Sequence, residues 1–447
     1  MTPSRVISVH PRTVIVLILL GWLGLTLFYA TGPVGSDDYI YLDIAHHPTP
    51  PSDPILITQG YARFGIWGPL RLADAIGLGT WFTFVIVPLI SAIGALALTG
   101  WLARRWMGVG AAAAMVSLGL VPYFIVFATI TLPDTMGACL LALGLLLVGP
   151  PLLERDVKRA VGRCLLGGMV VGLSFAAKET VILLCPAIAL FVLLYRRRQG
   201  WAWQRLSVIA IGAAAGLGVE MVVLWAISGD PLFHFHSMRI AYEQYGSDVT
   251  DYHWSTIAYY ASDYLRWMFD PRGAYGGWGP VYLLAMVYAC VRSTDWTRLL
   301  LCCGLVIGAY ISVGSIDLTR YYPIHHQPRY LITLLPIGAL LTAHMVQTLW
   351  CQRPKLRPAV SVIAVILIAA SLLQPNKFAG RTYFAPTLAA AKLAMTDDAL
   401  FGDGETNIVG SAQSVFRLAP LIRTSHRHPT SRELVAQLPV VATAKRM

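Results

Sequence analysis

The sequence predicts an all-α protein that crosses a membrane many times, and its composition, its long apolar runs and the charge of its loops all favour this class. Of the 447 residues, 56% are apolar and only 13% are charged, whereas a soluble domain carries roughly 25% charged residues. Apolar runs of about 17–25 residues have the length of membrane-spanning helices. Lys and Arg gather in alternate loops, as the positive-inside rule predicts for a polytopic membrane protein.

About eleven apolar runs have a length that allows them to span a bilayer. The first, which follows basic residues, also has features of a secretory signal peptide, but no clear cleavage site ends it and we expect a retained span. The predicted spans lie near residues 13–30, 80–102, 109–131, 133–150, 162–178, 180–195, 207–228, 277–292, 297–313, 329–350 and 358–374. We therefore expect a transmembrane domain at residues 1–374 and a polar outer tail or small domain at residues 375–447.

The loop charges also predict an orientation in the plasma (inner) membrane. With a cytoplasmic N-terminus, the short inner loops hold most Lys and Arg, and the outer loops hold most Asp and Glu. The outer side then includes a first loop at 31–79, a large loop at 229–276 and a last loop at 314–328. We expect the functional site on this side. No basic patch interleaved with aromatic residues predicts a nucleic-acid partner.

Two adjacent carboxylates, Asp37 and Asp38, stand just after the first predicted span. Tyr41 and Ala45 fall three and seven residues after Asp38, which places them on the same face of a helix. The pattern predicts a short helix on the membrane surface with an acidic pair at its start. Carboxylates also cap helix N-termini, so the local sequence leaves a purely structural role open.

Charged residues also stand in the other outer segments. Residues 61–71 carry Arg63 and Arg71, two very short turns carry Asp134 and the pair Lys178-Glu179, and Arg329-Tyr330 opens the span that contains Pro336. Each set has an ordinary explanation as a boundary anchor, a helix start or a salt bridge. Because burying charge beside a bilayer is costly, their common outer level favours a functional site.

Glu220 lies inside the seventh predicted span, about 12 Å from its outer end at about 1.5 Å per residue. It needs a partner, and we expect a Lys or Arg near the outer face, in a structural or a functional role. Histidines at positions 46 and 47, 234 and 236, and 325 and 326 make a divalent metal a further candidate, but no motif of fixed spacing accompanies them. We therefore assign no metal ligands and no definite cofactor.

Taken in order, these segments resemble the C-type membrane glycosyltransferases, in particular the protein O-mannosyltransferases and the lipid A aminoarabinose transferases. The resemblance covers roughly residues 13–350 and is carried by Asp37-Asp38, Leu132-Pro133-Asp134, the stretch 172–179 and Arg329-Tyr330 before Pro336. It implies an enzyme that takes a sugar from a polyprenyl-phosphate donor and passes it to an extracytoplasmic acceptor, a hydroxyl of a lipid, a glycan or a protein.

The resemblance also implies roles for individual residues. Asp37 and Asp38 match the family's acidic positions in the first loop, Asp134 the aspartate of the short turn, Lys178 the lysine that ends the fifth span, and Tyr330 the tyrosine of the last loop. One feature departs from the family: residues 67–70 read Trp-Gly-Pro-Leu where relatives often carry Lys-Pro-Pro or His-Pro-Pro. Arg63 or Arg71 would then supply the missing donor-phosphate contact.

The chemistry of glycosyl transfer agrees with these roles. An ionised Asp37 can act as the base for the acceptor hydroxyl, with Asp38 as its supporting carboxylate. Lys178 and Arg329, with Tyr330, Asp134 and Glu179 beside them, can hold the phosphate that leaves as an anion. Direct attack would invert the anomeric configuration. The alternatives are a polysaccharide ligase or polymerase that uses lipid-linked donors, and a secondary transporter, which would place its charges near the membrane midplane.

Overall fold

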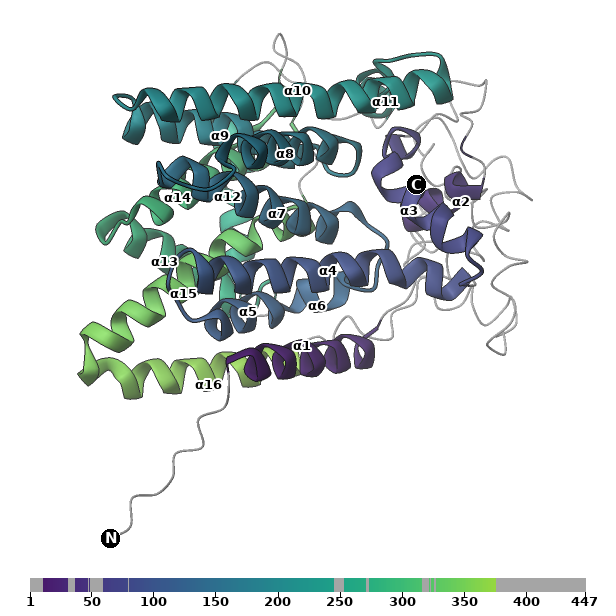
Figure 1. The fold of residues 1–447 in the computed structure, drawn as a ribbon. Helices are drawn as coiled ribbons and strands as arrows, with labels where there is room; N and C mark the ends of the chain where they lie inside the picture. The colour runs from purple at the N-terminus through teal and green to yellow at the C-terminus, as the bar shows by residue number, and fades with distance from the viewer. Residues whose placement is uncertain are drawn as a thin grey trace, which may run out of the picture.

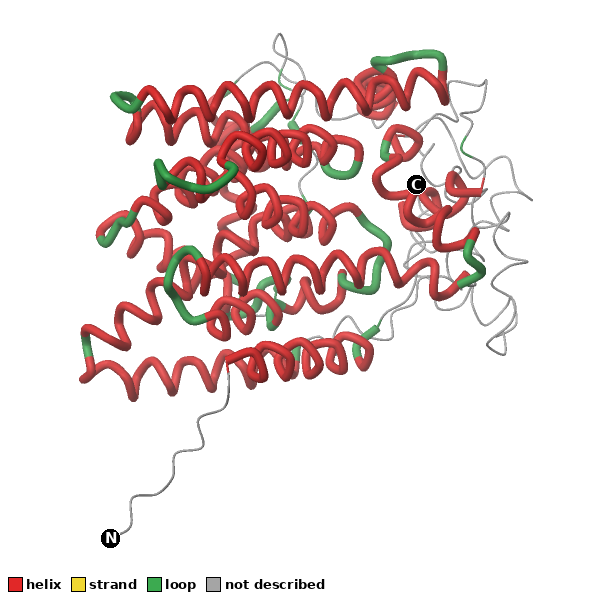
Figure 2. Tube along the Cα trace, in the orientation of Figure 1, coloured by secondary structure: helices red, strands yellow, loops and turns green. Residues whose placement is uncertain are grey.

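Long helices run side by side through the molecule (Figure 1), as expected of apolar segments that can satisfy their backbone groups in lipid only within a helix. The computed structural model describes residues 11–30, 37–46, 48, 59–78, 80–244, 253–270, 273–315, 321, 323–324 and 327–374. Over these residues Figure 2 shows helices and loops and no strand. The tail at 375–447 and parts of the three outer loops lie outside the described residues, so the expectations for them stay predictions.

The α-helices of the described part are α1 (Pro11–Phe28), α2 (Asp37–His46), α3 (Phe64–Ala75), α4 (Thr80–Arg105), α5 (Ala111–Gly119), α6 (Pro122–Phe127), α7 (Pro133–Leu153), α8 (Ala160–Leu173), α9 (Leu184–Phe191), α10 (Gly200–Ser228), α11 (Phe233–Gln244), α12 (Trp254–Phe269), α13 (Trp278–Val291), α14 (Asp295–Val313), α15 (Leu335–Gln352) and α16 (Arg357–Leu373). Short tighter or wider turns extend several of them: η2 (Gln59–Ala62), η3 (Ser174–Ala176), η4 (Glu179–Leu183), η5 (Val192–Arg196), η6 (Pro328–Leu334) and η7 (Pro354–Leu356).

The described residues confirm a multi-pass membrane protein. Seven helical segments are long and apolar enough to cross a membrane: Val85–Arg105, Pro133–Leu153, Glu179–Arg196, Gly200–Ser228, Asp295–Val313, Pro328–Gln352 and Pro354–Leu373. Three shorter apolar helices, Thr13–Phe28, Ala160–Ala176 and Trp278–Val291, fall on predicted spans. The span predicted near 109–131 is divided into two helices, because the helix breaks between α5 and α6, where Pro122 supplies no backbone donor; whether this segment crosses the membrane stays a prediction. The count of eleven spans stays a prediction.

The helices α8 and α10 approach each other closely because small residues line their contact. Gly168 and Gly172 on α8 face Gly212 and Gly216 on α10, each pair four residues apart. A Cβ atom at any of these positions would lie under 3.0 Å from backbone atoms of the opposite helix. This is the small-residue packing that lets membrane helices bring their backbones together, and it fixes α10, which carries Glu220.

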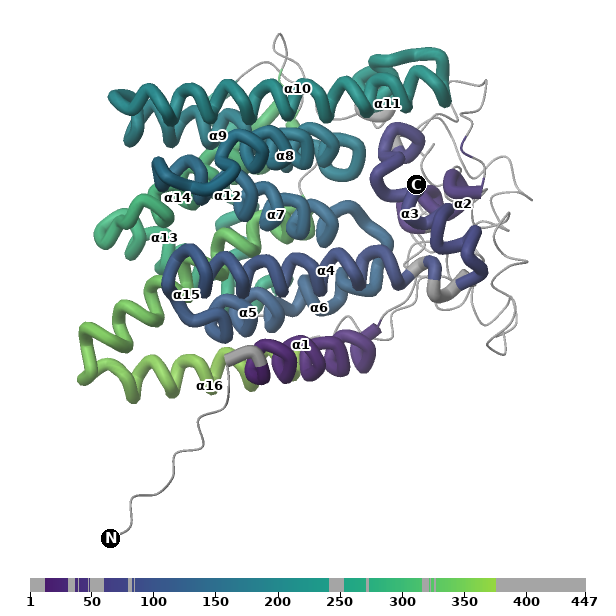
Figure 3. The backbone as a smooth tube through the Cα atoms, viewed as in Figure 1, coloured from purple at the N-terminus to yellow at the C-terminus, as the bar shows by residue number. Residues whose placement is uncertain are grey.

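Short helices cover one end of the bundle (Figures 1 and 3): α2 and α3 lie there beside the end of α10, where α11 begins. The predicted short helix after the first span is confirmed as α2, and its expected face is buried, since Asp38, Tyr41 and Ala45 are each exposed by 2% or less; its place on the membrane surface stays a prediction. The second interfacial segment forms η2 and α3. The charged turns that are predicted to face outward also reach this end, so the fold brings most of the predicted site residues together.

We expect Gly212→Ala to destabilise the protein, because the added methyl group would meet the backbone of α8. Overpacking of this kind costs about 1–3 kcal/mol. Gly218→Ala is the matched control, since Gly218 lies on the same helix with nothing within 4 Å of an added Cβ, and alanine favours helix over glycine. Thermal unfolding in detergent measures both variants. Equal melting temperatures for the two would contradict the close contact.

Candidate active site

Three breaks in the long helices place charged side chains at the covered end of the bundle. Asp134 stands in the first turn of α7 after Pro133, where the helix dipole favours a carboxylate. Lys178 is extended between η3 and η4, and Arg329 follows Pro328 at the start of η6. The start of α2 brings Asp37 to the same place. Each break turns a side chain toward its neighbours.

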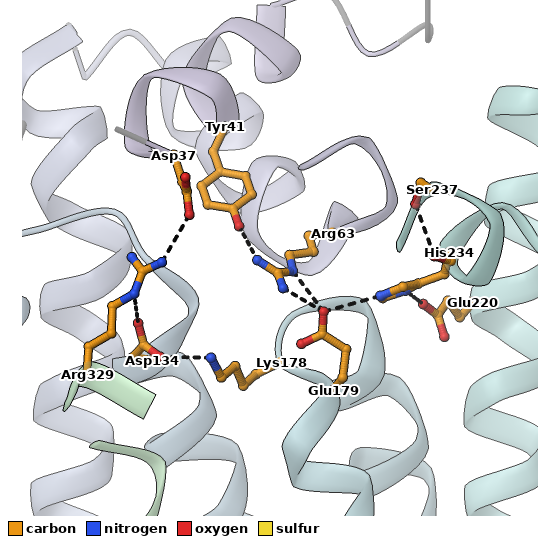
Figure 4. Close-up of polar contacts among 10 residues, drawn as sticks. All are labelled: Asp37, Tyr41, Arg63, Asp134, Lys178, Glu179, Glu220, His234, Ser237 and Arg329. Atoms are coloured by element: carbon orange, nitrogen blue, oxygen red, sulfur yellow. Dashed lines mark hydrogen bonds and ion pairs between the residues drawn. The ribbon is translucent and has the colours of Figure 1, made fainter. Parts of the chain in front are cut away.

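These four side chains form one row of alternating charge (Figure 4). The Nζ atom of Lys178 donates to Oδ1 of Asp134 at 2.9 Å. Arg329 lies between the two aspartates: its Nε is 3.9 Å from Oδ2 of Asp134, and its Nη2 donates to Oδ2 of Asp37 at 3.2 Å. Asp134 is fully buried, whereas the Asp37 side chain is 33% exposed. The row therefore runs from the protein interior to a partly open carboxylate.

Two further residues shape the inner half of this row. The ring of Tyr330 lies 4.3 Å from the Lys178 ammonium and 5.7 Å from the Arg329 guanidinium, so it contributes a cation–π contact to both. Gly137, one turn after Asp134 on α7, leaves room for Lys178: a Cβ there would lie 2.9 Å from Cγ of the lysine. Tyr330 therefore packs against Lys178, and the absence of a side chain at Gly137 leaves the space that the lysine occupies.

A second polar cluster adjoins the row at Glu179. The carboxylate Oε1 of Glu179 accepts from Nε and Nη2 of Arg63, at 3.1 and 2.6 Å. The remaining Nη1 of Arg63 donates to the hydroxyl of Tyr41 at 2.6 Å. Because Tyr41 lies four residues after Asp37 on α2, Arg63 connects the helix junction at Glu179 to the helix that carries the acidic pair.

The partner of Glu220 is a histidine, so the expectation of Lys or Arg is wrong. Nδ1 of His234 lies 2.6 Å from Oε1 of Glu220, and its Nε2 lies 3.4 Å from Oε1 of Glu179. The chain reverses between α10 and α11 at Gly229, whose φ of 75° suits glycine, and this turn returns His234 to the buried Glu220. A loop residue, rather than a cation on a neighbouring span, therefore neutralises the intramembrane charge.

The environment of this cluster favours charged His234 and neutral Tyr41. Burial lowers the pKa of His234, but its hydrogen bonds to Glu179 and Glu220 raise it more, so the pKa lies above its ordinary 6.5. Both ring nitrogens face carboxylates, and only the protonated ring can donate from both. Burial raises the pKa of the Tyr41 hydroxyl in spite of Arg63, so the phenol keeps its proton.

The predicted site residues divide into three groups. Asp37, Asp134, Lys178, Arg329 and Tyr330 lie together, and Arg63 and Glu179 adjoin them through the second cluster. Asp38 is fully buried within the covered end. Arg71 is exposed on α3 and makes no hydrogen bond or ion pair with the other candidates in the described part of the chain.

Sequence reasoning did not assign His234 and Glu220 to the site, although both lie beside it. The one signal in the sequence was the single carboxylate inside an apolar span, which had to have a partner. As for a metal, no group of three or more His, Cys, Asp or Glu residues within the described segments could hold an ion. His236 pairs instead with Asp230. A divalent metal stays a prediction.

Comparison with known proteins shows that the helices of this chain are arranged as in several solved structures. No protein-family model matches the chain, and no curated protein matches it. Among solved structures, ArnT from Cupriavidus metallidurans in the apo state gives a TM-score of 0.58 at 18% identity, covering 90% of this chain and 76% of ArnT. The same protein bound to undecaprenyl phosphate gives 0.52 at 16% identity, covering 95% and 77%.

An oligosaccharyltransferase gives a similar match. AglB from Archaeoglobus fulgidus, in complex with an inhibitory peptide and a dolichol-phosphate, has a TM-score of 0.56 at 12% identity, covering 88% of this chain and 58% of AglB. A structure of the oligosaccharyltransferase from the same organism with Zn and sulfate gives 0.55 at 13% identity, covering 86% and 56%. The chain thus spans just over half the length of the oligosaccharyltransferase.

The described helices share the fold of ArnT and AglB. This is the fold that the resemblance to the C-type membrane glycosyltransferases predicts. At identities of 12–18% the likeness concerns the fold alone.

We expect the stability contributed by His234 to fall as the pH rises. Because folding raises its pKa, the contribution is complete below pH 6.5, the ordinary value, and is lost as the pH passes through the raised pKa. The measurement is the difference in Tm between the wild type and His234→Gln, followed from about pH 5 to about pH 9. His236→Gln is the control on the same helix. A difference that stays constant or grows with pH would contradict the assignment.

Proposed function

We propose that the protein is a polyprenyl-phosphate-sugar-dependent glycosyltransferase that moves a sugar to an extracytoplasmic hydroxyl of a lipid, a glycan or a protein, with inversion at the anomeric carbon. The observation that carries the proposal is the row of Asp37, Arg329, Asp134 and Lys178, which sets cations for a phosphate beside a carboxylate that can act as a base. The shared fold supports it, because ArnT binds undecaprenyl phosphate and AglB a dolichol-phosphate.

Lys178 and Arg329 are the cations that we assign to the donor phosphate. Both are largely enclosed, with 5% and 15% of their side chains exposed. The Nε atom of Arg329 and Oδ2 of Asp134 are buried and make no hydrogen bond with the residues that the structure describes. Although these two atoms lie 3.9 Å apart as an ion pair, Nε of Arg329 keeps a hydrogen-bond donor that a phosphate could accept. A guanidinium suits a phosphate because it can donate two parallel hydrogen bonds.

Asp37 is the residue that we assign to the acceptor. The acceptor hydroxyl attacks the anomeric carbon and its proton passes to Asp37, while the bond from that carbon to the phosphate oxygen breaks. Lys178 and Arg329 stabilise the negative charge that develops on the leaving phosphate. Asp37 is better placed than Asp38 because Asp38 is fully buried. A single displacement of this kind inverts the sugar and leaves no sugar on the enzyme.

The remaining candidates take supporting roles in this proposal. Of the two arginines that could replace the missing lysine, Arg63 adjoins the row through Glu179, whereas Arg71 is exposed.

We also propose that this end of the bundle faces outward, because the basic loops are expected in the cytoplasm.

The placement of charge favours a transferase over a secondary transporter. Transporters bind their substrates near the membrane midplane, between discontinuous helices. Here the row stands where α7, η4 and η6 begin. Glu220, which lies within α10, is paired with His234, so we assign it no role in binding a transported substrate.

We expect Asp37→Asn to lower sugar transfer steeply and to leave the fold stable. The substitution keeps the shape and removes the base, which contributes about 10²- to 10⁴-fold to a rate. Asparagine caps a helix about as well as aspartate, so a purely structural Asp37 predicts normal transfer. Turnover is measured with polyprenyl-phosphate mannose and polyprenyl-phosphate aminoarabinose, beside the thermal stability of each variant.

Asp38→Asn and Asp74→Asn are the comparisons for this test. Asp74 is a carboxylate of α3 that pairs with His46 away from the row, so its variant should transfer at a normal rate. Near-normal transfer by Asp37→Asn would leave the acidic pair as a helix cap and would direct the search for the base to Asp134.

A further inference from the structure

The buried Glu220 is costly unless a positive group neutralises it, since an unpaired charge within a span is strongly unfavourable. Its partner could have come from a neighbouring span. It comes instead from His234, in the first turn of α11, where the large outer loop begins. Ser237 one turn later donates to the His234 carbonyl at 3.0 Å, and the ring of Phe175 lies 4.5 Å from the imidazole. The start of this loop is therefore anchored on α10.

From His234 an unbroken set of polar contacts leads to α2 (Figure 4). Nε2 of the imidazole faces Oε1 of Glu179, and the same oxygen accepts two hydrogen bonds from Arg63. Arg63 then donates to Tyr41. The contacts join α10, α11, η4, the residue before α3, and α2, which are far apart in the sequence.

The charges along these contacts balance only when all members are present. Arg63 and protonated His234 supply two positive charges, and Glu179 and Glu220 supply two negative charges. Removing one member leaves a buried charge without compensation, which is strongly destabilising. Glu179 shares one oxygen between Arg63 and His234, so this carboxylate links the two cations.

We propose that His234 and Glu220 are positioning residues that hold Arg63 through Glu179, so that the docking of the large outer loop sets the place of α2 and of Asp37. This inference rests on the proposed function for the role of Asp37, whereas the coupling of α11 to α2 is a property of the fold. In this proposal Arg63 holds α2, the helix that carries Asp37, because its three side-chain nitrogens already donate to Glu179 and Tyr41.

Substitutions of His234 can test the contacts of Nδ1 and Nε2 separately. An asparagine amide reaches about as far as Nδ1 and can keep the bond to Glu220, whereas a glutamine amide reaches about as far as Nε2 and can keep the bond to Glu179. His234→Asn therefore breaks the contacts at Glu179 while Glu220 stays hydrogen-bonded. His234→Gln is the conservative rescue. His236→Asn is the matched control, because His236 is exposed on the same helix and pairs with Asp230.

The direct readout is hydrogen–deuterium exchange of the backbone amides in residues 37–46, which needs no enzymatic activity. We expect faster exchange there in His234→Asn, a smaller change in His234→Gln and none in His236→Asn. The affinity of all three variants for undecaprenyl phosphate should stay within about twofold of the wild-type value. The turnover of His234→Asn should fall by about tenfold or more, because a misplaced reacting group slows the reaction. Equal exchange in His234→Asn and His236→Asn would overturn the proposal.

A second variant, at Glu220, tests the same coupling in case His234→Asn does not fold. Glu220→Gln keeps the shape and an acceptor for the imidazole but removes the charge, and it should raise exchange in residues 37–46 in the same direction. Combined with Arg63→Lys it should show less than the sum of the two single effects, although the residues do not touch; strict additivity would contradict the coupling. If the wild type transferred neither sugar, the proposed function would fail while the exchange data still decided the coupling.

Discussion

A charged side chain that leaves water at the edge of a bilayer needs an opposite charge within the protein, and this requirement organises the covered end of the bundle. Asp134 is fully buried and touches Lys178, while Arg329 lies between Asp134 and Asp37. Such pairs add little net stability, because the cost of removing both charges from water is comparable to their attraction. Because charges at the ends of otherwise apolar helices are costly, we propose a functional role for them.

The same requirement ties together segments that are distant in the chain. Within the described residues, the contacts at Glu179 connect α3, α10 and α11 through Arg63, Glu220 and His234. Close packing of glycines between α8 and α10 fixes the helix on which Glu220 stands. Packing in the apolar part of the bundle thereby determines the geometry of the polar end, and the polar end in turn holds α2, where Asp37 meets Arg329.

The sequence was sufficient for features that depend on local pattern. Apolar length predicted a bundle of membrane-spanning helices, and helical spacing predicted the face of α2 shared by Asp38, Tyr41 and Ala45, because both follow from the geometry of one helix. The break between α5 and α6 was missed, since hydropathy continues across Pro122. The partner of Glu220 was also missed: its identity depends on how α11 folds back after Gly229, and no local pattern encodes a contact between a loop and a span. Arg71 was grouped with Arg63 by spacing, but the two differ in burial.

Mass spectrometry of the lipids that copurify with the protein in mild detergent can identify what Lys178 and Arg329 bind. If Lys178 and Arg329 form a site for the phosphate of a lipid-linked sugar, the wild type should carry polyprenyl phosphate, free or bearing a sugar. Arg329→Ala, purified to the same monodispersity, should lose it. A wild-type protein that carries no polyprenyl phosphate, or equal recovery of that lipid with Arg329→Ala, would contradict the account.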